Sequence, residues 1–112
     1  MIPKNALEIV NRYFVEHNDG VKSGDFKNLV ELFAHDCEMS FAFGSLGTLK
    51  SQDAIISAFK NAPPSDELVA RSIEQSESAI VANYGWKSRK DSKGGSLTFE
   101  FEGARIKRLI IR

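Results

Sequence analysis

The stretch Cys-Glu-Met-Ser-Phe-Ala-Phe, residues 37–43, decides how the chain is interpreted, because its apolar residues recur at every second position. Cys37, Met39, Phe41 and Phe43 fall on one face of an extended chain, and the residues between them fall on the other. The pattern predicts a strand with one large apolar face. Because Cys37 lies on that face, we expect an inert core residue rather than a nucleophile.

Helical patterns flank this strand on both sides. In the segment before it, apolar residues recur at spacings of three, four and seven, and His17 falls inside that apolar stripe. Gly24 follows the stripe and is suited to the left-handed conformation that ends a helix. The three predicted helices, with their capping residues, are 5–22 (Asn5), 26–34 (Asp25) and about 52–60 (Ser51).

After the third helix, the period of the apolar residues changes to two, which predicts a run of strands joined by tight turns. The predicted strands are about 67–75, 78–90, 95–102 and 104–112, with a turn at 44–47 and a hairpin loop at 91–95. Helices followed by a run of strands are typical of an α+β domain rather than of alternating βαβ units. The length of 112 residues predicts one domain, 1–112.

Composition and charge exclude several classes of function. Fifteen basic residues balance fifteen acidic ones, so the basic excess of a nucleic-acid binder is missing. One cysteine and two histidines without ligand spacing predict no metal site, and we expect no cofactor. No apolar run approaches the length of a membrane span, which predicts no membrane association. The expected location is therefore the cytoplasm.

Four motifs and their order carry a resemblance to a known family. They are Ser-Gly-Asp-Phe at 23–26, Leu-Phe-Ala-His-Asp at 32–36, Ala-Ile-Ile-Ser-Ala-Phe at 54–59 and Phe-Glu-Phe-Glu-Gly-Ala-Arg-Ile at 99–106. The chain resembles the nuclear transport factor 2-like superfamily, in particular its SnoaL-like and ketosteroid-isomerase-like branch. The resemblance implies a cystatin-like cone, in which a strongly bent antiparallel sheet wraps around three helices and opens into a pocket. It also implies a homodimer through the sheet.

The same resemblance allows a test for isomerase chemistry, which needs a carboxylate base and two acidic hydrogen-bond donors in the pocket. Aligned on the family pattern, the base position is Phe41 and the donor-acid position is Leu97. The position of the donor tyrosine is His17, and Tyr13 lies one turn earlier. Neither Phe41 nor Leu97 can accept or donate a proton, so isomerisation by that machinery is not expected.

His17 and Asp36 are the remaining candidate catalytic residues. The imidazole of His17 titrates near neutral pH and is a candidate general acid or base, although without a carboxylate partner it also fits a core histidine. Asn18, adjacent in sequence, is expected to point elsewhere on the helix. Asp36 follows the second predicted helix, where it is either a base at the pocket rim or a local turn residue.

Aromatic and apolar residues of the strands, together with Tyr13 of the first helix, either line the pocket or fill the core of a small domain. The predicted lining residues are Tyr13, Met39, Phe41, Phe43, Tyr84, Trp86, Leu97, Phe99 and Phe101. Such a pocket suits a small apolar ligand, and this is the preferred function. The alternatives are a non-catalytic dimerisation module and an acid–base isomerase or cyclase using His17 and Asp36. Apolar residues of both parities in the last strand, among them Ile106 and Ile110, favour a homodimer.

Overall fold

The computed structural model describes residues 2–43, 47–90 and 93–112, and over these residues the chain forms three helices and a six-stranded sheet. The helices are α1 (Ala6–Ser23), α2 (Lys27–Val30) and α3 (Gln52–Asn61). The strands are β1 (Phe33–Phe41), β2 (Thr48–Leu49), β3 (Leu68–Gln75), β4 (Ile80–Trp86), β5 (Gly95–Glu102) and β6 (Arg105–Ile111). The predicted α+β class is confirmed.

The helix ends follow two of the expected signals. Gly24 has a φ of 83° directly after α1, and its amide donates to the carbonyl of Gly20 at 2.7 Å. The hydroxyl of Ser51 accepts a hydrogen bond from the Ala54 amide at 3.0 Å, which caps α3. Asn5 precedes α1, but its side chain forms no capping hydrogen bond.

The second helix is shorter than its sequence pattern predicts. α2 has four residues, and the chain is already extended at Phe33, where the helix was expected to continue to residue 34. The early start of β1 is stabilised by neighbouring elements, because the carbonyl of Phe33 accepts hydrogen bonds from Gln52 and Arg105. Asp36 therefore lies within a strand and not at the end of a helix.

The strand order is β2-β1-β6-β5-β4-β3, so β2 and β3 are the outer strands. β1 runs parallel to β6, whereas the other neighbouring pairs are antiparallel. The sheet is thus mixed, and the expectation of a wholly antiparallel sheet is wrong at this one pairing. A bulge between Ala70 and Ser72 inserts Arg71 as an extra residue of β3. The turn predicted at 44–47 and the loop predicted at 91–95 lie partly outside the described residues.

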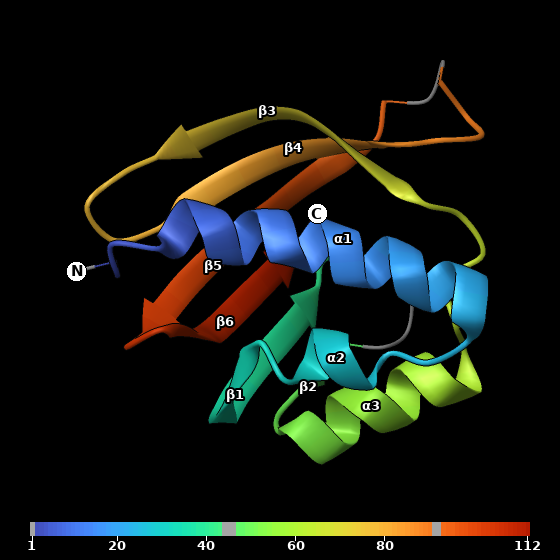
Figure 1. Cartoon of the computed structure of the whole chain (residues 1–112), viewed down its shortest axis with the longest axis horizontal. Helices are drawn as coiled ribbons and strands as arrows, with labels where there is room; N and C mark the ends of the chain where they lie inside the picture. The colour runs from blue at the N-terminus through green and yellow to red at the C-terminus, as the bar shows by residue number, and fades with distance from the viewer. Residues whose placement is uncertain (1, 44–46, 91–92) are drawn as a thin grey trace.

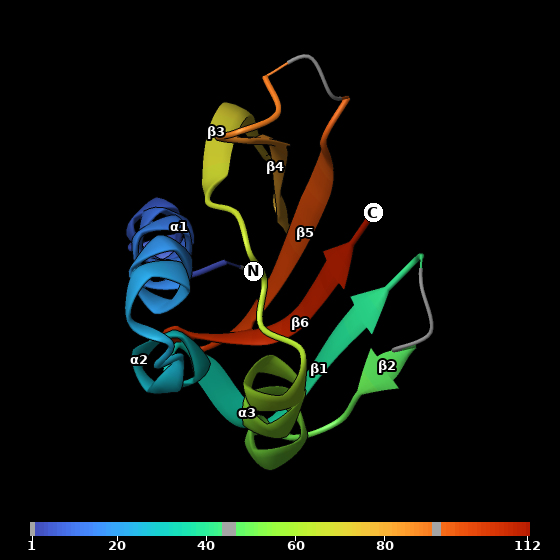
Figure 2. The ribbon, with the colours of Figure 1, turned by 90° about the vertical axis from the view of Figure 1, so that its right-hand side faces the viewer.

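The sheet curls around the helices without closing. All three helices lie on one side of it, and Figure 1 shows α1 running across β4, β5 and β6. In Figure 2 the sheet curves from β2 and β1 beside α3 to β4 and β3 beside α1. This arrangement gives the expected cone, with the inner face of the sheet turned towards the helices.

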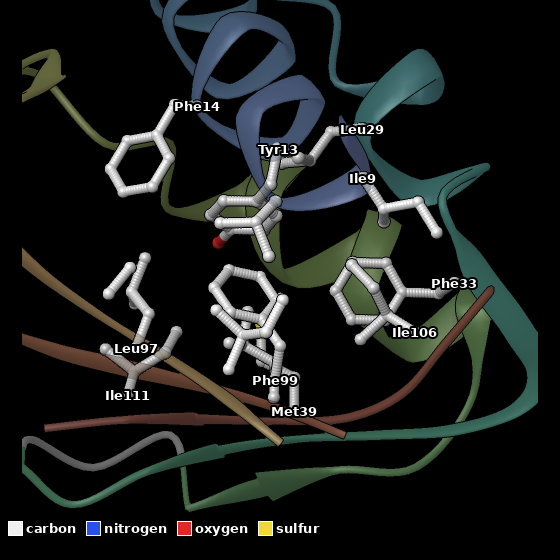
Figure 3. Packing of buried hydrophobic residues seen from close by; sticks show 14 of the residues in the cluster. Ile9, Tyr13, Phe14, Leu29, Phe33, Met39, Leu97, Phe99, Ile106 and Ile111 are labelled. Carbon is white, nitrogen blue, oxygen red and sulfur yellow. The ribbon is translucent and has the colours of Figure 1, made fainter. Parts of the chain in front are cut away.

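The core lies between α1 and the inner face of the sheet. Tyr13, Phe33 and Phe99 are among its largest fully buried side chains, and the rings of Tyr13 and Phe99 meet edge to face at 5.4 Å (Figure 3). Burying an aromatic side chain of this size contributes roughly 2–3 kcal/mol. The aromatic residues therefore join α1 to the middle of the sheet.

A bulge in β6 explains why its apolar residues stand at both even and odd positions of the strand. Glu100 pairs with Arg108 and Phe101 pairs with Ile106, so Lys107 is an extra residue between them. Ile106, Leu109 and Ile111 are consequently all buried on the inner face. Ile110, which pairs with Ser40 and Thr98, is the residue left for the outer face. β6 thus presents Ile110 to the outer face instead of the wider apolar surface that the sequence indicated, and the homodimer stays a prediction.

Candidate functional site

A pocket opens at one end of the cone, between the helices and the ends of the strands. Its cavity volume is about 160 Å³, it is partly open, and its wall is almost wholly apolar. The residues that line it are Tyr13, His17, Phe41, Phe43, Leu49, Ala58, Phe59, Ala62, Pro64, Leu68, Tyr84, Trp86, Leu97 and Ile111. The wall thus receives residues from α1, from α3 and from all six strands or the segments next to them.

Six of the nine residues predicted to line the pocket do so. Met39 and Phe99 are instead fully buried in the core, and Phe101 packs against the core from near the hairpin that follows β5. The alternation in β5 places Leu97, Phe99 and Phe101 on the same face, but successive residues of that face lie about 6.6 Å apart along the strand. Leu97 alone of the three reaches the open end.

Half of the wall was missed by the sequence reasoning. The missed residues are Leu49, Ala58, Phe59, Ala62, Pro64, Leu68 and Ile111. Phe59 lies on the apolar side expected for α3, and Ile111 lies on the inner face of β6. The spacing of apolar residues could therefore have indicated both as lining residues. Ala62 and Pro64 belong to the segment between α3 and β3, for which no periodic signal exists.

No carboxylate lines this pocket among the residues that the structure describes. Phe41 and Leu97, the two positions aligned with isomerase acids, both face the cavity. Asp36 does not, because its side chain is 98% exposed in β1 and pairs with Lys107 of β6 at 3.3 Å. The proposed pair of His17 and Asp36 is therefore not brought together. Nor do the described residues contain a group of three or more side chains able to hold a metal ion.

The hydroxyl of Tyr13 is the first polar group of the wall. Tyr13 is 2% exposed, and its hydroxyl has no hydrogen-bond partner within the described ranges. Burial, followed by the proximity of Tyr84, raises the pKa of this phenol far above its ordinary value, so the group stays protonated. Tyr13 therefore presents to the pocket a buried O–H donor that bonds no other group of the described residues.

This unsatisfied donor predicts that the Tyr13→Phe variant is more stable than the wild type. Leaving a buried polar group unpaired costs about 1–3 kcal/mol, so its removal is expected to raise the free energy of unfolding by about 1 kcal/mol. Tyr84→Phe is the matched control, because the Tyr84 hydroxyl donates to the carbonyl of Arg112 at 3.4 Å and its loss should not stabilise. Urea denaturation of both variants checks the prediction, and destabilisation by Tyr13→Phe would contradict it.

His17 is the second polar group, and Asn18 orients it. His17 is 4% exposed, and its Nδ1 lies 3.2 Å from Oδ1 of Asn18. The Asn18 amide in turn donates from Nδ2 to the carbonyl of Leu68 at 2.9 Å and accepts at Oδ1 from the Leu68 amide at 2.8 Å. The expectation that Asn18 points elsewhere is wrong, because the start of β3 holds its side chain beside the imidazole.

The environment of His17 favours its neutral form. Burial lowers the pKa of the imidazole, and the hydrogen bond to Asn18 and the charge of Glu67 oppose this shift only in part. In the unfolded chain the histidine pKa is about 6.5. The unfolded state therefore binds a proton at a higher pH than the folded state does.

It follows that the stabilising effect of neutral His17 is complete above about pH 6.5 and is lost as the pH falls towards the lower folded value. We expect the free energy of unfolding to decrease over this window in the wild type and in His35→Gln, whose replaced ring is exposed. His17→Gln should remove that part of the slope. Urea midpoints measured from pH 7.5 to 5.5 check this, and an unchanged slope in His17→Gln would contradict it.

Trp86 and Tyr84 form the β4 side of the wall. Their rings meet edge to face at 5.5 Å, and the guanidinium carbon of Arg89 lies 5.4 Å from the centre of the Trp86 ring. The nearby segment that contains Pro64 is joined to the end of β4, because Asp66 accepts hydrogen bonds from the amide and hydroxyl of Ser88. The hydroxyl bond to Ser88 is the main cause that lowers the pKa of Asp66, so this anchor stays ionised at neutral pH.

The single cysteine of the chain gives no sign of a reactive site. Cys37 is 1% exposed, and burial raises the pKa of its thiol, which agrees with an inert core residue. The described helices include none of the length and apolarity needed to span a membrane.

No family model matches the chain, and no curated protein sequence matches it.

Solved structures, in contrast, match almost the whole chain. A candidate isomerase from Bacillus subtilis aligns with a TM-score of 0.75 and 16% identity, covering 96% of this chain and 85% of the other. A nuclear transport factor 2-like protein from Anabaena variabilis gives 0.73 and 13%, with coverages of 96% and 88%. A candidate polyketide cyclase from Sinorhizobium meliloti gives 0.67 and 23%, with 94% of each chain covered. The three helices, the curled six-stranded sheet and these neighbours together show that the chain has the nuclear transport factor 2-like fold.

Proposed function

We propose that this chain is a SnoaL-like ligand-binding domain that holds a small, apolar, single-ring compound in the pocket of the cone. The observation that carries the proposal is the apolar cavity of about 160 Å³ in which Tyr13 and His17 are buried polar groups. An apolar cavity of about 150 Å³ is large enough to bind benzene. The volume therefore supports one ring with a short substituent rather than a fused-ring steroid.

The lining supports binding without carboxylate catalysis. Proton abstraction next to a carbonyl requires a base within hydrogen-bond reach of the reacting carbon. The positions where relatives would carry acids are Phe41 and Leu97, and both side chains face the cavity as hydrocarbons. We therefore propose a binding function for this pocket and no isomerisation of ketosteroids.

Fluorescence of Trp86 provides the test, because it is the only tryptophan of the chain and lines the pocket. Titration with toluene should change the emission in a saturable manner. Ala58→Phe is expected to abolish the change by filling the cavity from α3. Ser57→Phe, on the exposed side of the same helix, is the matched control and should bind as the wild type does.

Two results would overturn the proposal. One is a titration without saturation, or with the same saturation in Ala58→Phe, which would leave the association module as the better function. The other is turnover of a Δ5-3-ketosteroid, which would show that an acid outside the wall described above reaches the substrate.

A further inference from the structure

Tyr13 and His17 have fixed hydrogen-bonding roles in the pocket, and the role of His17 is set through Asn18 by the backbone of Leu68. A backbone amide can only donate and a backbone carbonyl can only accept. Because both groups of Leu68 bond the side chain of Asn18, the two ends of that side chain are distinguished: Nδ2 faces the carbonyl and Oδ1 faces the amide. The orientation of Asn18 thus follows from its partners.

This orientation determines which nitrogen of His17 carries the proton. Oδ1 of Asn18 can only accept, so Nδ1 of the neutral imidazole, 3.2 Å away, must be the protonated nitrogen. Nε2 is then left with a lone pair. Within the described residues Nε2 has no hydrogen-bond partner, although the ring is buried and lines the pocket.

Tyr13 supplies the opposite polarity one turn earlier on α1. Its hydroxyl is protonated and bonds no other group in the part of the chain that the structure describes, and the centres of the Tyr13 and His17 rings lie 6.2 Å apart. Both residues line the same pocket, so a ligand hydroxyl that reaches both groups can accept from Tyr13 and donate to His17. The remaining wall offers an apolar ligand only hydrocarbon contacts, the Trp86 indole and the already bonded Tyr84 hydroxyl.

We infer that Tyr13 and His17 form a donor–acceptor pair in which the Tyr13 hydroxyl donates and His17 Nε2 accepts, and that the pocket takes a single-ring compound bearing a phenolic or enolic hydroxyl. This inference rests on the proposed function for the ligand class, whereas the protonation of His17 is independent of it. The ligand class follows from the chemistry of the pair, since one hydroxyl satisfies both buried groups and a ketone or ether oxygen satisfies only Tyr13.

Nitrogen-15 NMR of the wild-type protein near pH 8 tests the pair without any ligand. The chain has two histidines, so the exposed ring of His35 is an internal reference for the buried ring of His17. Long-range correlations to the ring protons are expected to assign the proton of His17 to Nδ1 and to show a bare Nε2. A proton on Nε2 of His17 would overturn the inference.

Three probes of nearly equal size test the ligand class through Trp86 fluorescence: toluene, anisole and phenol. Tyr13→Phe should weaken anisole and phenol binding about tenfold, the value of one hydrogen bond, and leave toluene within about twofold. His17→Leu should weaken phenol binding about tenfold and leave anisole and toluene within about twofold.

The two proposals fail in different ways. If none of the probes binds to the wild type, the proposed function and the ligand class are wrong, while the NMR result still decides the polarity of the pair. If all three probes bind and neither variant distinguishes phenol from anisole, the proposed function stands and the donor–acceptor inference is overturned.

Discussion

Phe99→Ala is expected to destabilise the protein by about 3–5 kcal/mol, the usual cost of deleting a fully buried phenylalanine ring. Phe99 lies in the middle of β5 without exposure and contacts Tyr13 of α1 at 5.4 Å between ring centres. The cavity left behind would separate α1 from the sheet. A domain of this size has a total stability of about 5–15 kcal/mol, so the loss is a large part of it.

Phe43→Ala is the matched control. Phe43 was also predicted to line the pocket, and it does so, but it is 54% exposed at the mouth. Its removal should change the free energy of unfolding by less than about 0.5 kcal/mol. Urea denaturation of the two variants measures the difference, and equal destabilisation would show that the core does not extend through β5 as described.

Asn18→Ala is expected to cost about 2–4 kcal/mol, because it leaves the amide and carbonyl of Leu68 without their partner. Both groups are bonded by the Asn18 side chain, and Leu68 is 6% exposed. The substitution also frees Nδ1 of His17. Equilibrium unfolding in urea gives the stability, and nitrogen-15 NMR gives the state of the imidazole.

Asn83→Ala is the matched control, because it removes a side-chain amide that bonds no backbone group of Leu68. Asn83 donates to the Ser72 hydroxyl at 2.8 Å on the exposed face of the sheet, so its loss should cost less than about 0.5 kcal/mol. If Asn18→Ala is no more destabilising than Asn83→Ala, the junction between α1 and β3 does not depend on Asn18.

The sequence predicted which face a strand residue occupies better than how deep it lies. Alternation assigned Met39, Phe41 and Phe43 to one side of the first strand, but they range from the closed core to the exposed mouth. Depth depends on strand length, curvature and register, which are set by pairing with distant segments. The parallel pairing of β1 with β6 could not be predicted for the same reason, because no local pattern specifies a partner about seventy residues away.

In the candidate site, too, the sequence predicted the burial of a residue but not its hydrogen-bond partners. His17 was singled out because it falls in an apolar stripe, and it is buried as that stripe indicates. Its orienting residue could not be predicted, because adjacent helix positions generally point apart and Leu68, which holds Asn18, is fifty residues later. Bulges at Arg71 and Lys107 likewise have no counterpart in the alternation, and the second of them made β6 look apolar on both faces.

The bulge in β3 has a consequence for how the protein behaves at high concentration. An outer strand exposes backbone groups to which another chain can add, and this is a common route to aggregation. Arg71 interrupts the regular edge of β3, and its guanidinium bonds the carbonyls of Lys90 and Lys93. At the opposite edge β2 has only two residues. Neither edge offers a long regular template, so strand addition between copies is disfavoured at both.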